Sequence, residues 1–186
     1  MDPKYLGELI EEWKTLGPVR FAAQYRDAML QLRDLGKDDE ADDAAFHTAF
    51  MNREELKEAT DGTAGGSGEH KLPSLSVGQV VRVAKRQGGA FQDRIGVGRA
   101  RNVDVPLQLA KMSKYHAFFS KSEDGRSYSI TDAGSTNGTF LDGKRLPEKQ
   151  AVSLSDGQEI AFGPYRFTFY TPDGFVEMVK RRAALR

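Results

Sequence analysis

The sequence predicts a mainly β protein, in which an antiparallel β-sandwich follows an α-helical N-terminal module and precedes a short C-terminal helix. Two observations support this fold class. Apolar residues recur at helical spacing through residues 1–60, whereas residues 75–172 contain short β-type segments separated by glycine-containing turns. The segment between them, residues 61–74, is rich in Gly, Ser and Thr, which is typical of a flexible linker.

The N-terminal module begins with a predicted amphipathic helix over residues 3–16. Its apolar residues follow the i, i+3, i+4, i+7 pattern that places them on one face of a helix. They are Leu6, Leu9, Ile10 and Trp13. Gly17 and Pro18 should end this helix, because glycine is frequent beyond a helix C-terminus and proline cannot continue the hydrogen-bond ladder.

Two further helices are expected in this module. The second should run from Pro18 to Leu35 and end at Gly36, and the third should begin at Asp38 and fade by Thr60. The apolar stripe of the second helix is formed by Phe21, Tyr25, Ala28 and Leu32. Three short helices bury only a marginal core, so the module should pack on the β domain, on a second protein or on a second copy of itself.

The β-type segments are residues 79–83, 93–97, 128–130, 151–154, 159–162 and 166–170. Turn-forming sequences separate them, which is the pattern of an antiparallel sandwich. The turn Asp142–Gly143 should be a tight type I′ hairpin, which requires positive φ at both central residues. Residues 173–186 then predict the C-terminal helix, whose basic end lies at the negative pole of the helix dipole.

The composition excludes several classes of site. The 186 residues include no cysteine, so disulfides and thiolate metal sites are excluded, and the three histidines are too scattered to suggest a metal site. Paired carboxylates and nucleotide-binding loops are not recognised, so neither a cofactor nor catalysis is expected. Because no long apolar segment and no N-terminal signal occur, we expect a soluble, cytoplasmic chain.

Charge is divided unevenly along the chain. Residues 1–61 contain 8 Lys and Arg against 15 Asp and Glu, whereas the rest of the chain contains 19 against 12. The net charge of zero therefore combines an acidic N-terminal part with a basic C-terminal part. This division can serve solubility alone, or the basic part can meet an anionic ligand.

Four short polar or basic motifs lie between the predicted strands. They are Gly98–Arg99, residues 113–116 (Ser-Lys-Tyr-His), residues 134–139 (Gly-Ser-Thr-Asn-Gly-Thr) and Asp142–Gly143. Binding residues concentrate on loops that a rigid sheet positions. These loops are therefore the candidate functional site.

The order Gly-Arg, Ser-x-x-His, Thr-Asn-Gly-Thr and a following x-Gly turn resembles a forkhead-associated (FHA) domain. Each motif alone is common, but the ordered set with strand-like sequence between its members is specific. The resemblance covers about residues 75–172. It implies an FHA-type β-sandwich that binds phosphothreonine peptides and is not an enzyme.

The resemblance assigns phosphopeptide binding to five residues. Arg99 is expected to contact the phosphate or a neighbouring peptide carbonyl, and the hydroxyls of Ser113 and Thr136 are expected to reach the phosphate. Lys114 departs from the arginine or asparagine often found at its position, but keeps a hydrogen-bond donor. The side-chain amide of Asn137, a donor and an acceptor at once, should bind the peptide backbone beside the phosphorylated residue.

Gly98, His116 and Gly138 are expected to support the binding loops. Ser113 and His116 could be mistaken for a nucleophile and its base, but the sequence supplies no acid to orient the pair. The resemblance implies instead that the histidine holds the loops through hydrogen bonds.

These inferences predict a phosphothreonine-binding adaptor in a Ser/Thr kinase pathway. The alternative is a structural or oligomerisation module that uses the same fold without phosphate. The expected partner is a phosphothreonine-containing protein or peptide, and a second protein could dock on the N-terminal helices. Thr60 and Thr63 are candidate phospho-acceptors that could bind the site intramolecularly. Membrane and nucleic-acid partners are not expected.

Overall fold

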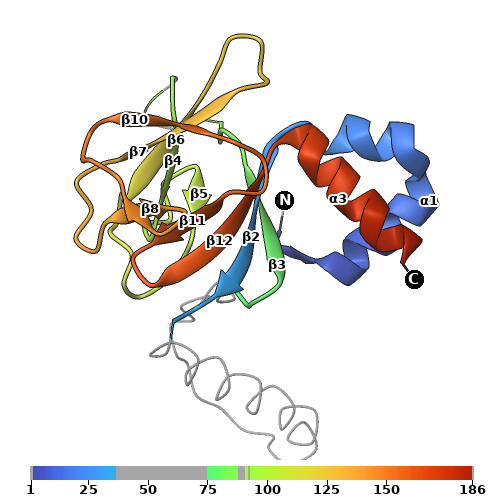
Figure 1. The fold of residues 1–186 in the computed structure, drawn as a ribbon, viewed down its shortest axis with the longest axis horizontal. Helices are drawn as coiled ribbons and strands as arrows, with labels where there is room; N and C mark the ends of the chain where they lie inside the picture. The colour runs from blue at the N-terminus through green and yellow to red at the C-terminus, as the bar shows by residue number, and fades with distance from the viewer. Residues whose placement is uncertain (1, 37–74, 88–90, 92, 186) are drawn as a thin grey trace, which may run out of the picture.

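The computed structural model describes residues 2–36, 75–87, 91 and 93–185. Within these residues, two β-sheets pack face to face as a sandwich, and two helices lie together at one end of it (Figure 1). The predicted antiparallel β-sandwich with an N-terminal and a C-terminal helical element is therefore confirmed.

The larger sheet contains seven strands in the order β1-β3-β2-β12-β11-β8-β9, and the smaller contains five in the order β10-β7-β6-β4-β5. All paired strands are antiparallel except β4 and β5, which are parallel. The larger sheet consists of β1 Lys4–Tyr5, β2 Ala28–Asp34, β3 Gln79–Val83, β8 Thr139–Leu141, β9 Lys144–Arg145, β11 Glu159–Phe162 and β12 Tyr165–Tyr170. The smaller sheet consists of β4 Ile95–Gly98, β5 Val105–Pro106, β6 Ala117–Lys121, β7 Tyr128–Asp132 and β10 Ala151–Leu154. Each of the six predicted β-type segments corresponds to one of these strands.

The hairpin of β8 and β9 has the predicted tight turn. Its two central residues have positive φ, 48° at Asp142 and 76° at Gly143, as a type I′ turn requires. The register pairs Phe140 with Arg145, and the turn thereby fixes the face on which each residue of the short strand β9 lies.

The prediction of a second helix from Pro18 to Leu35 is wrong in its C-terminal half. The helical segment ends at Gln24, and Ala28–Asp34 form strand β2 between β3 and β12 of the larger sheet. Strand β2 therefore pairs with one strand on each side, although its residues lie in the segment predicted to be helical.

The spacing of the apolar residues explains this error. Ala28 and Leu32 are four residues apart, which fits one face of a helix but also one face of a strand, because four is an even number. Every residue from Ala28 to Leu32 is buried. A strand with both faces buried lacks the polar alternation that identifies a strand by its sequence.

The two helices are α1 Leu6–Gln24 and α3 Pro172–Ala184. Gly17, with φ of 72°, interrupts the helical conformation inside α1, so the predicted break at Gly17 and Pro18 is present as a kink. The predicted C-terminal helix is confirmed as α3. Thr171 caps its N-terminus by accepting a hydrogen bond from the Gly174 N–H at 3.1 Å.

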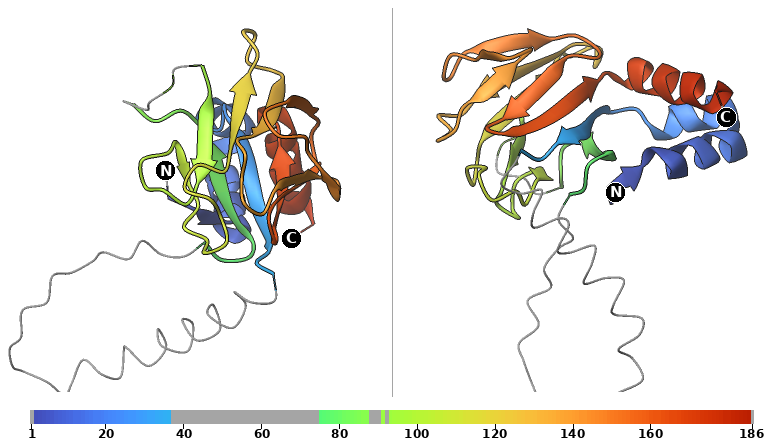
Figure 2. Two further views of the ribbon diagram at one scale, coloured as in Figure 1. Left: turned by 90° about the vertical axis from the view of Figure 1, so that its left-hand side faces the viewer. Right: turned by 60° about the horizontal axis from the view of Figure 1, so that its bottom comes forward.

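In the part of the chain that the structure describes, two hydrophobic cores hold the fold together. The larger core fills the sandwich and includes Leu30, Phe119, Ile130 and Phe167. The smaller core lies between the helices and the outer face of the larger sheet, and consists of Leu9, Ile10, Phe21, Tyr25, Met29, Val80, Phe175 and Val179. The helices therefore pack on the β domain, one of the three predicted arrangements. Figure 2 shows them side by side at the end of the sandwich.

The predicted third helix, from Asp38 to Thr60, and the predicted linker 61–74 lie outside the described residues. No helix in the described ranges combines the length and apolar character needed to cross a bilayer. Those ranges also contain no group of three or more His, Asp or Glu side chains arranged to hold a metal ion.

Candidate functional site

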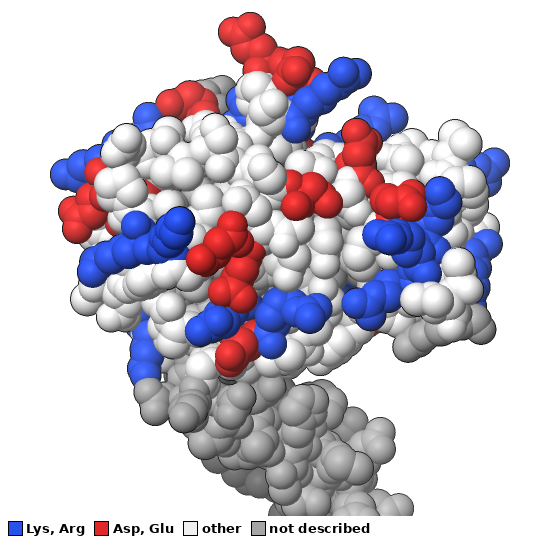
Figure 3. All heavy atoms as spheres, viewed as in Figure 1, with Lys and Arg blue, Asp and Glu red and all other residues white. Residues whose placement is uncertain are grey.

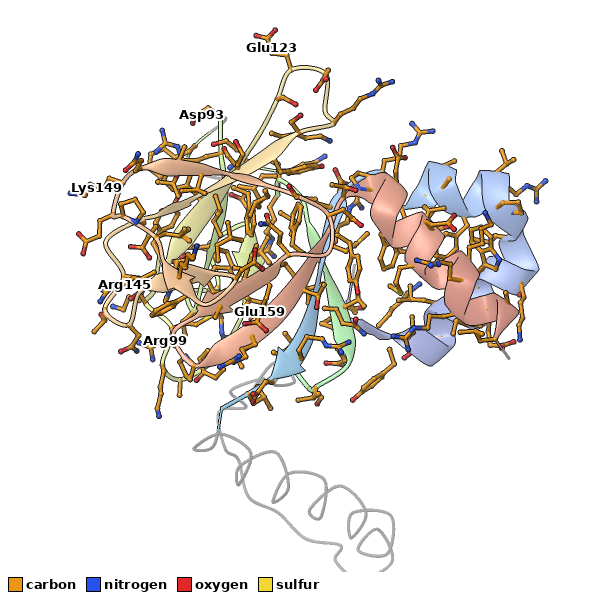
Figure 4. The ribbon with its side chains drawn as sticks, viewed as in Figure 1. Asp93, Arg99, Glu123, Arg145, Lys149 and Glu159 are labelled. Atoms are coloured by element: carbon orange, nitrogen blue, oxygen red, sulfur yellow. The ribbon has the colours of Figure 1, made fainter. Side chains whose placement is uncertain are left out.

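Three loops at one end of the sandwich carry the residues that the sequence singled out. Arg99 directly follows β4, Ser113 and Lys114 lie between β5 and β6, and Thr136 and Asn137 lie between β7 and β8. The first two loops connect strands of the smaller sheet, and the third passes from the smaller sheet to the larger one. Figure 4 labels Arg99 at the end of the sandwich farthest from the helices.

Backbone hydrogen bonds join the first loop to the second. The N–H of Arg99 donates to the carbonyl of Ser113 at 2.9 Å, and the N–H of Ala100 donates to the carbonyl of Lys114 at 3.0 Å. The backbone at Gly98 packs so closely against the second loop that an added Cβ would clash with the Lys114 carbonyl oxygen. This close approach explains why glycine occupies position 98.

Ser113 and Thr136 meet although they are 23 residues apart in sequence. The N–H of Thr136 donates to Ser113 Oγ at 3.1 Å, and the two hydroxyl oxygens are 3.4 Å apart. Ser113 is half-buried and Thr136 is exposed. The two hydroxyls can therefore act on one ligand at the same time.

Asn137 connects the third loop to the second. Its Nδ2 donates to the carbonyl of Lys111 at 2.7 Å, while its side chain remains exposed. A Cβ added to Gly163 would lie 3.0 Å from the Cβ of Asn137, so the turn between β11 and β12 supports the side chain from below. Because Nδ2 is held, the orientation of the amide Oδ1 is fixed as well.

His116 is fully buried beneath the three loops and bonds two of them. Its Nδ1 accepts from the N–H of Ser113 at 3.2 Å, so Nε2 must carry the proton that it donates to the carbonyl of Gly138 at 3.1 Å. Burial lowers the pKa of His116, although the Gly138 carbonyl and the charge of Asp132 act in the opposite direction. The histidine is therefore held in its neutral form, and the hydroxyl of Ser113 is bonded to Thr136 rather than to the imidazole.

Asp132, at the end of β7, organises the third loop and was not predicted from the sequence. Its Oδ1 accepts from the N–H groups of Gly134 and Ser135 at 2.9 and 3.0 Å. Its Oδ2 accepts from the hydroxyls of Ser135 and Thr139 at 2.6 and 2.5 Å. Burial alone would raise the pKa of Asp132, but these hydrogen bonds outweigh it and lower the pKa. The order Asp-Ala-Gly-Ser, in which an aspartate precedes a glycine by two residues, is the sequence signal of such a turn.

The exposed groups of the site are predominantly hydrogen-bond donors. Arg99, Lys114, Thr136 and Asn137 are exposed. Among the residues that the structure describes, the Arg99 guanidinium and the Lys114 ammonium have no hydrogen bond or ion pair. Figure 3 shows basic side chains, with acidic side chains among them, at the surface of the same end of the sandwich. Such a cluster of free donors on a rigid base suits an anion with several acceptor oxygens.

Thr60 and Thr63, the candidate phospho-acceptors, lie outside the described residues, so their binding to this site stays a prediction.

The chain is similar to known regulatory proteins. A family model described as the FHA domain matches residues 95–163. The oxoglutarate dehydrogenase inhibitor of Corynebacterium jeikeium is 33% identical over 128 residues, which are 66% of this chain and 85% of that protein. The glycogen accumulation regulator GarA of Mycolicibacterium smegmatis is 33% identical over 131 residues, which are 69% of this chain and 80% of that protein.

A solved structure of Mycobacterium tuberculosis EmbR, in complex with a low affinity phosphopeptide, is 32% identical, with a TM-score of 0.38, over 42% of this chain and 20% of EmbR. The family match spans the strands and loops that build the candidate site, and two relatives are one-third identical over at least 80% of their length. The chain therefore belongs to the family of FHA-domain proteins.

Proposed function

We propose that this chain binds phosphothreonine-containing peptides through the three loops and acts as a non-catalytic adaptor in a Ser/Thr kinase pathway. The observation that carries the proposal is the hydrogen bond between the Thr136 N–H and Ser113 Oγ, which joins two motifs distant in sequence into one donor-rich surface. Membership of the FHA family supports the same ligand class.

The phosphate is the first part of the proposed ligand. Phosphothreonine carries about −1.5 to −2 charges at neutral pH and three acceptor oxygens, so it requires several converging donors. We assign these to the guanidinium of Arg99, the ammonium of Lys114 and the hydroxyls of Ser113 and Thr136. The two cations are exposed and unpaired within the described residues, so no ion pair must be broken before the phosphate binds.

The peptide backbone is the second part. Asn137 donates one N–H to Lys111, which leaves its Oδ1 and its second N–H for the backbone beside the phosphorylated residue. A preference for threonine over serine requires a slot for one methyl group. Burial of that methyl contributes roughly 1 kcal/mol, which is about fivefold in affinity.

The loops are held before any ligand arrives. His116 and Asp132 fix the second and third loops through six hydrogen bonds in total, four of them to Asp132. Binding therefore loses little loop entropy, which favours affinity for a short peptide. Because His116 directs Nδ1 at a backbone N–H and not at the Ser113 hydroxyl, the pair lacks the geometry of a nucleophile and its base.

A calorimetric titration of the full chain tests the proposal. A phosphothreonine peptide should bind with micromolar affinity, its unphosphorylated form should not bind, and Arg99→Ala or Asn137→Ala should weaken binding at least tenfold, as loss of a hydrogen bond to a charged or buried partner does. Arg126→Ala, in the exposed turn between β6 and β7, is the control and should leave binding unchanged. Equal binding of the phosphorylated and unphosphorylated peptides would refute the proposal.

A further inference from the structure

Arg145 lies directly beside the candidate site, on β9 of the neighbouring hairpin. A Cβ built on Gly138 would come within 2.9 Å of Arg145 Nε and 3.3 Å of Nη2, so the guanidinium packs against the backbone that follows Asn137. Both Asn137 and Arg145 are exposed. Figure 4 shows Arg145 and Arg99 at the same end of the sandwich. The Arg145 guanidinium therefore lies next to the residue that is proposed to bind the peptide backbone.

The charge of Arg145 is not compensated by its neighbours. Within the described ranges its guanidinium has no hydrogen bond and no ion pair. The acidic side chains of the adjacent strands are engaged elsewhere. Asp142 accepts from Gln158 Nε2 at 2.8 Å and from the N–H of Glu159 at 3.0 Å. Glu159 itself pairs with Arg166 at 3.3 Å. Arg145 is therefore available to an anionic group of a ligand.

On the basis of the proposed phosphothreonine site, we propose that Arg145 is a specificity-determining residue that recognises an acidic side chain flanking the phosphothreonine. A guanidinium presents a planar fork that matches a carboxylate with two parallel hydrogen bonds. In this arrangement Arg99 binds the phosphate and Arg145 binds the flanking carboxylate. Because the guanidinium packs against Gly138, the residue that follows Asn137, and an extended peptide advances about 3.3 to 3.6 Å per residue, we place the carboxylate within about three positions of the phosphothreonine.

Lys144 is the matched control for this inference. It adjoins Arg145 on the same strand and is equally exposed, and no hydrogen bond or ion pair engages it within the described part of the chain. Lys144 pairs with Leu141 and Arg145 pairs with Phe140, so the two side chains lie on opposite faces of the hairpin. Substitution of either residue by glutamine removes one positive charge from β9. Only Arg145→Gln removes the guanidinium beside Gly138.

The test is a set of calorimetric titrations with phosphothreonine peptides on an alanine background. One peptide carries no acid, and each of the others carries one glutamate at a different position within three residues of the phosphothreonine. The unaltered chain should bind one of the glutamate peptides about fivefold more tightly than the acid-free peptide. Arg145→Gln should abolish that preference, Lys144→Gln should keep it, and Arg145→Lys should retain part of it. The acid-free peptide should bind all four proteins within about twofold, since an exposed charge acts weakly at a distance.

The outcomes separate this inference from the proposed function. If the unaltered chain binds every phosphothreonine peptide equally, or if Lys144→Gln abolishes the preference as fully as Arg145→Gln does, Arg145 is not a specificity residue while phosphothreonine binding stands. If the chain binds none of the phosphothreonine peptides, the proposed function fails and this inference fails with it. Thermal unfolding of each variant, with a midpoint close to that of the unaltered chain, establishes that the fold is intact.

Discussion

The backbone N–H of Ser113 donates a hydrogen bond to Nδ1 of the buried His116 at 3.2 Å. This bond exists only while Nδ1 is unprotonated, because a protonated Nδ1 would direct its hydrogen at another donor. The imidazole also donates to Gly138, so a single neutral side chain holds the second and third loops in one arrangement. The protonation state of His116 is therefore linked to the stability of the site.

The free energy of unfolding should fall as the pH drops below about 6.5. Burial lowers the pKa of His116 in the folded state, so the unfolded state binds a proton more readily. The stabilisation from neutral His116 is complete above the unfolded value of 6.5 and is lost as the pH falls from there toward the folded pKa. Urea unfolding between pH 7.5 and pH 5 measures this dependence. His116→Gln should be less stable at pH 7.5 and should show a weaker dependence; an unchanged dependence would rule out the assigned role.

Asp132→Ala should destabilise the protein by about 3 kcal/mol, because it removes a buried acceptor of four hydrogen bonds and leaves their donors unsatisfied. Asp124 provides a matched control in the exposed turn between β6 and β7, where it accepts from Ser122 Oγ at 2.5 Å and from the Arg126 N–H at 3.0 Å. Asp124→Ala should cost much less than Asp132→Ala, since water can replace the bonds of an exposed carboxylate. Chemical denaturation compares the two, and equal losses would contradict the organising role of Asp132.

Removal of residues 1–70 should abolish cooperative folding. Strand β2 lies between β3 and β12, and its residues Ala28, Leu30 and Leu32 are fully buried in the sandwich core. Without it, two strands would present unpaired edges and the core would open to solvent. The fragment 71–186 should therefore lack the dispersed amide NMR spectrum of the full chain. A dispersed spectrum and a sharp thermal transition would show that β2 is dispensable for the fold.

The sequence was sufficient to locate the candidate site but not to place every strand. The site residues occur in short motifs of polar residues and glycine, and these motifs can be recognised in the sequence without knowing how the strands pair. They are Arg99, Ser113, Thr136 and Asn137. Ala28 and Leu32 carry no such signal, because their burial on β2 depends on strands contributed from the distant C-terminal half of the chain. The helical spacing of the apolar residues predicted the conformation correctly up to Gln24. Beyond it, tertiary packing and not the spacing determined the conformation.

Asp132 illustrates a second limit of the sequence. Its turn signal is visible in the order Asp-Ala-Gly-Ser, but its burial and its bond to Thr139, seven residues later, arise only when β7 and β8 join opposite sheets. Arg145 shows the same limit, since its position beside Gly138 follows from the hairpin register and not from any motif. Local chemistry could therefore be predicted, whereas contacts that depend on long-range pairing could not.

Amide chemical-shift mapping of the full chain with a phosphothreonine peptide tests the central claim most directly. The account predicts that the largest shifts occur at Arg99, Ser113, Lys114, Thr136 and Asn137, that the amides of α1 and α3 are unaffected, and that the unphosphorylated peptide causes no shifts. Shifts centred on the helices, or equal shifts with the unphosphorylated peptide, would contradict it.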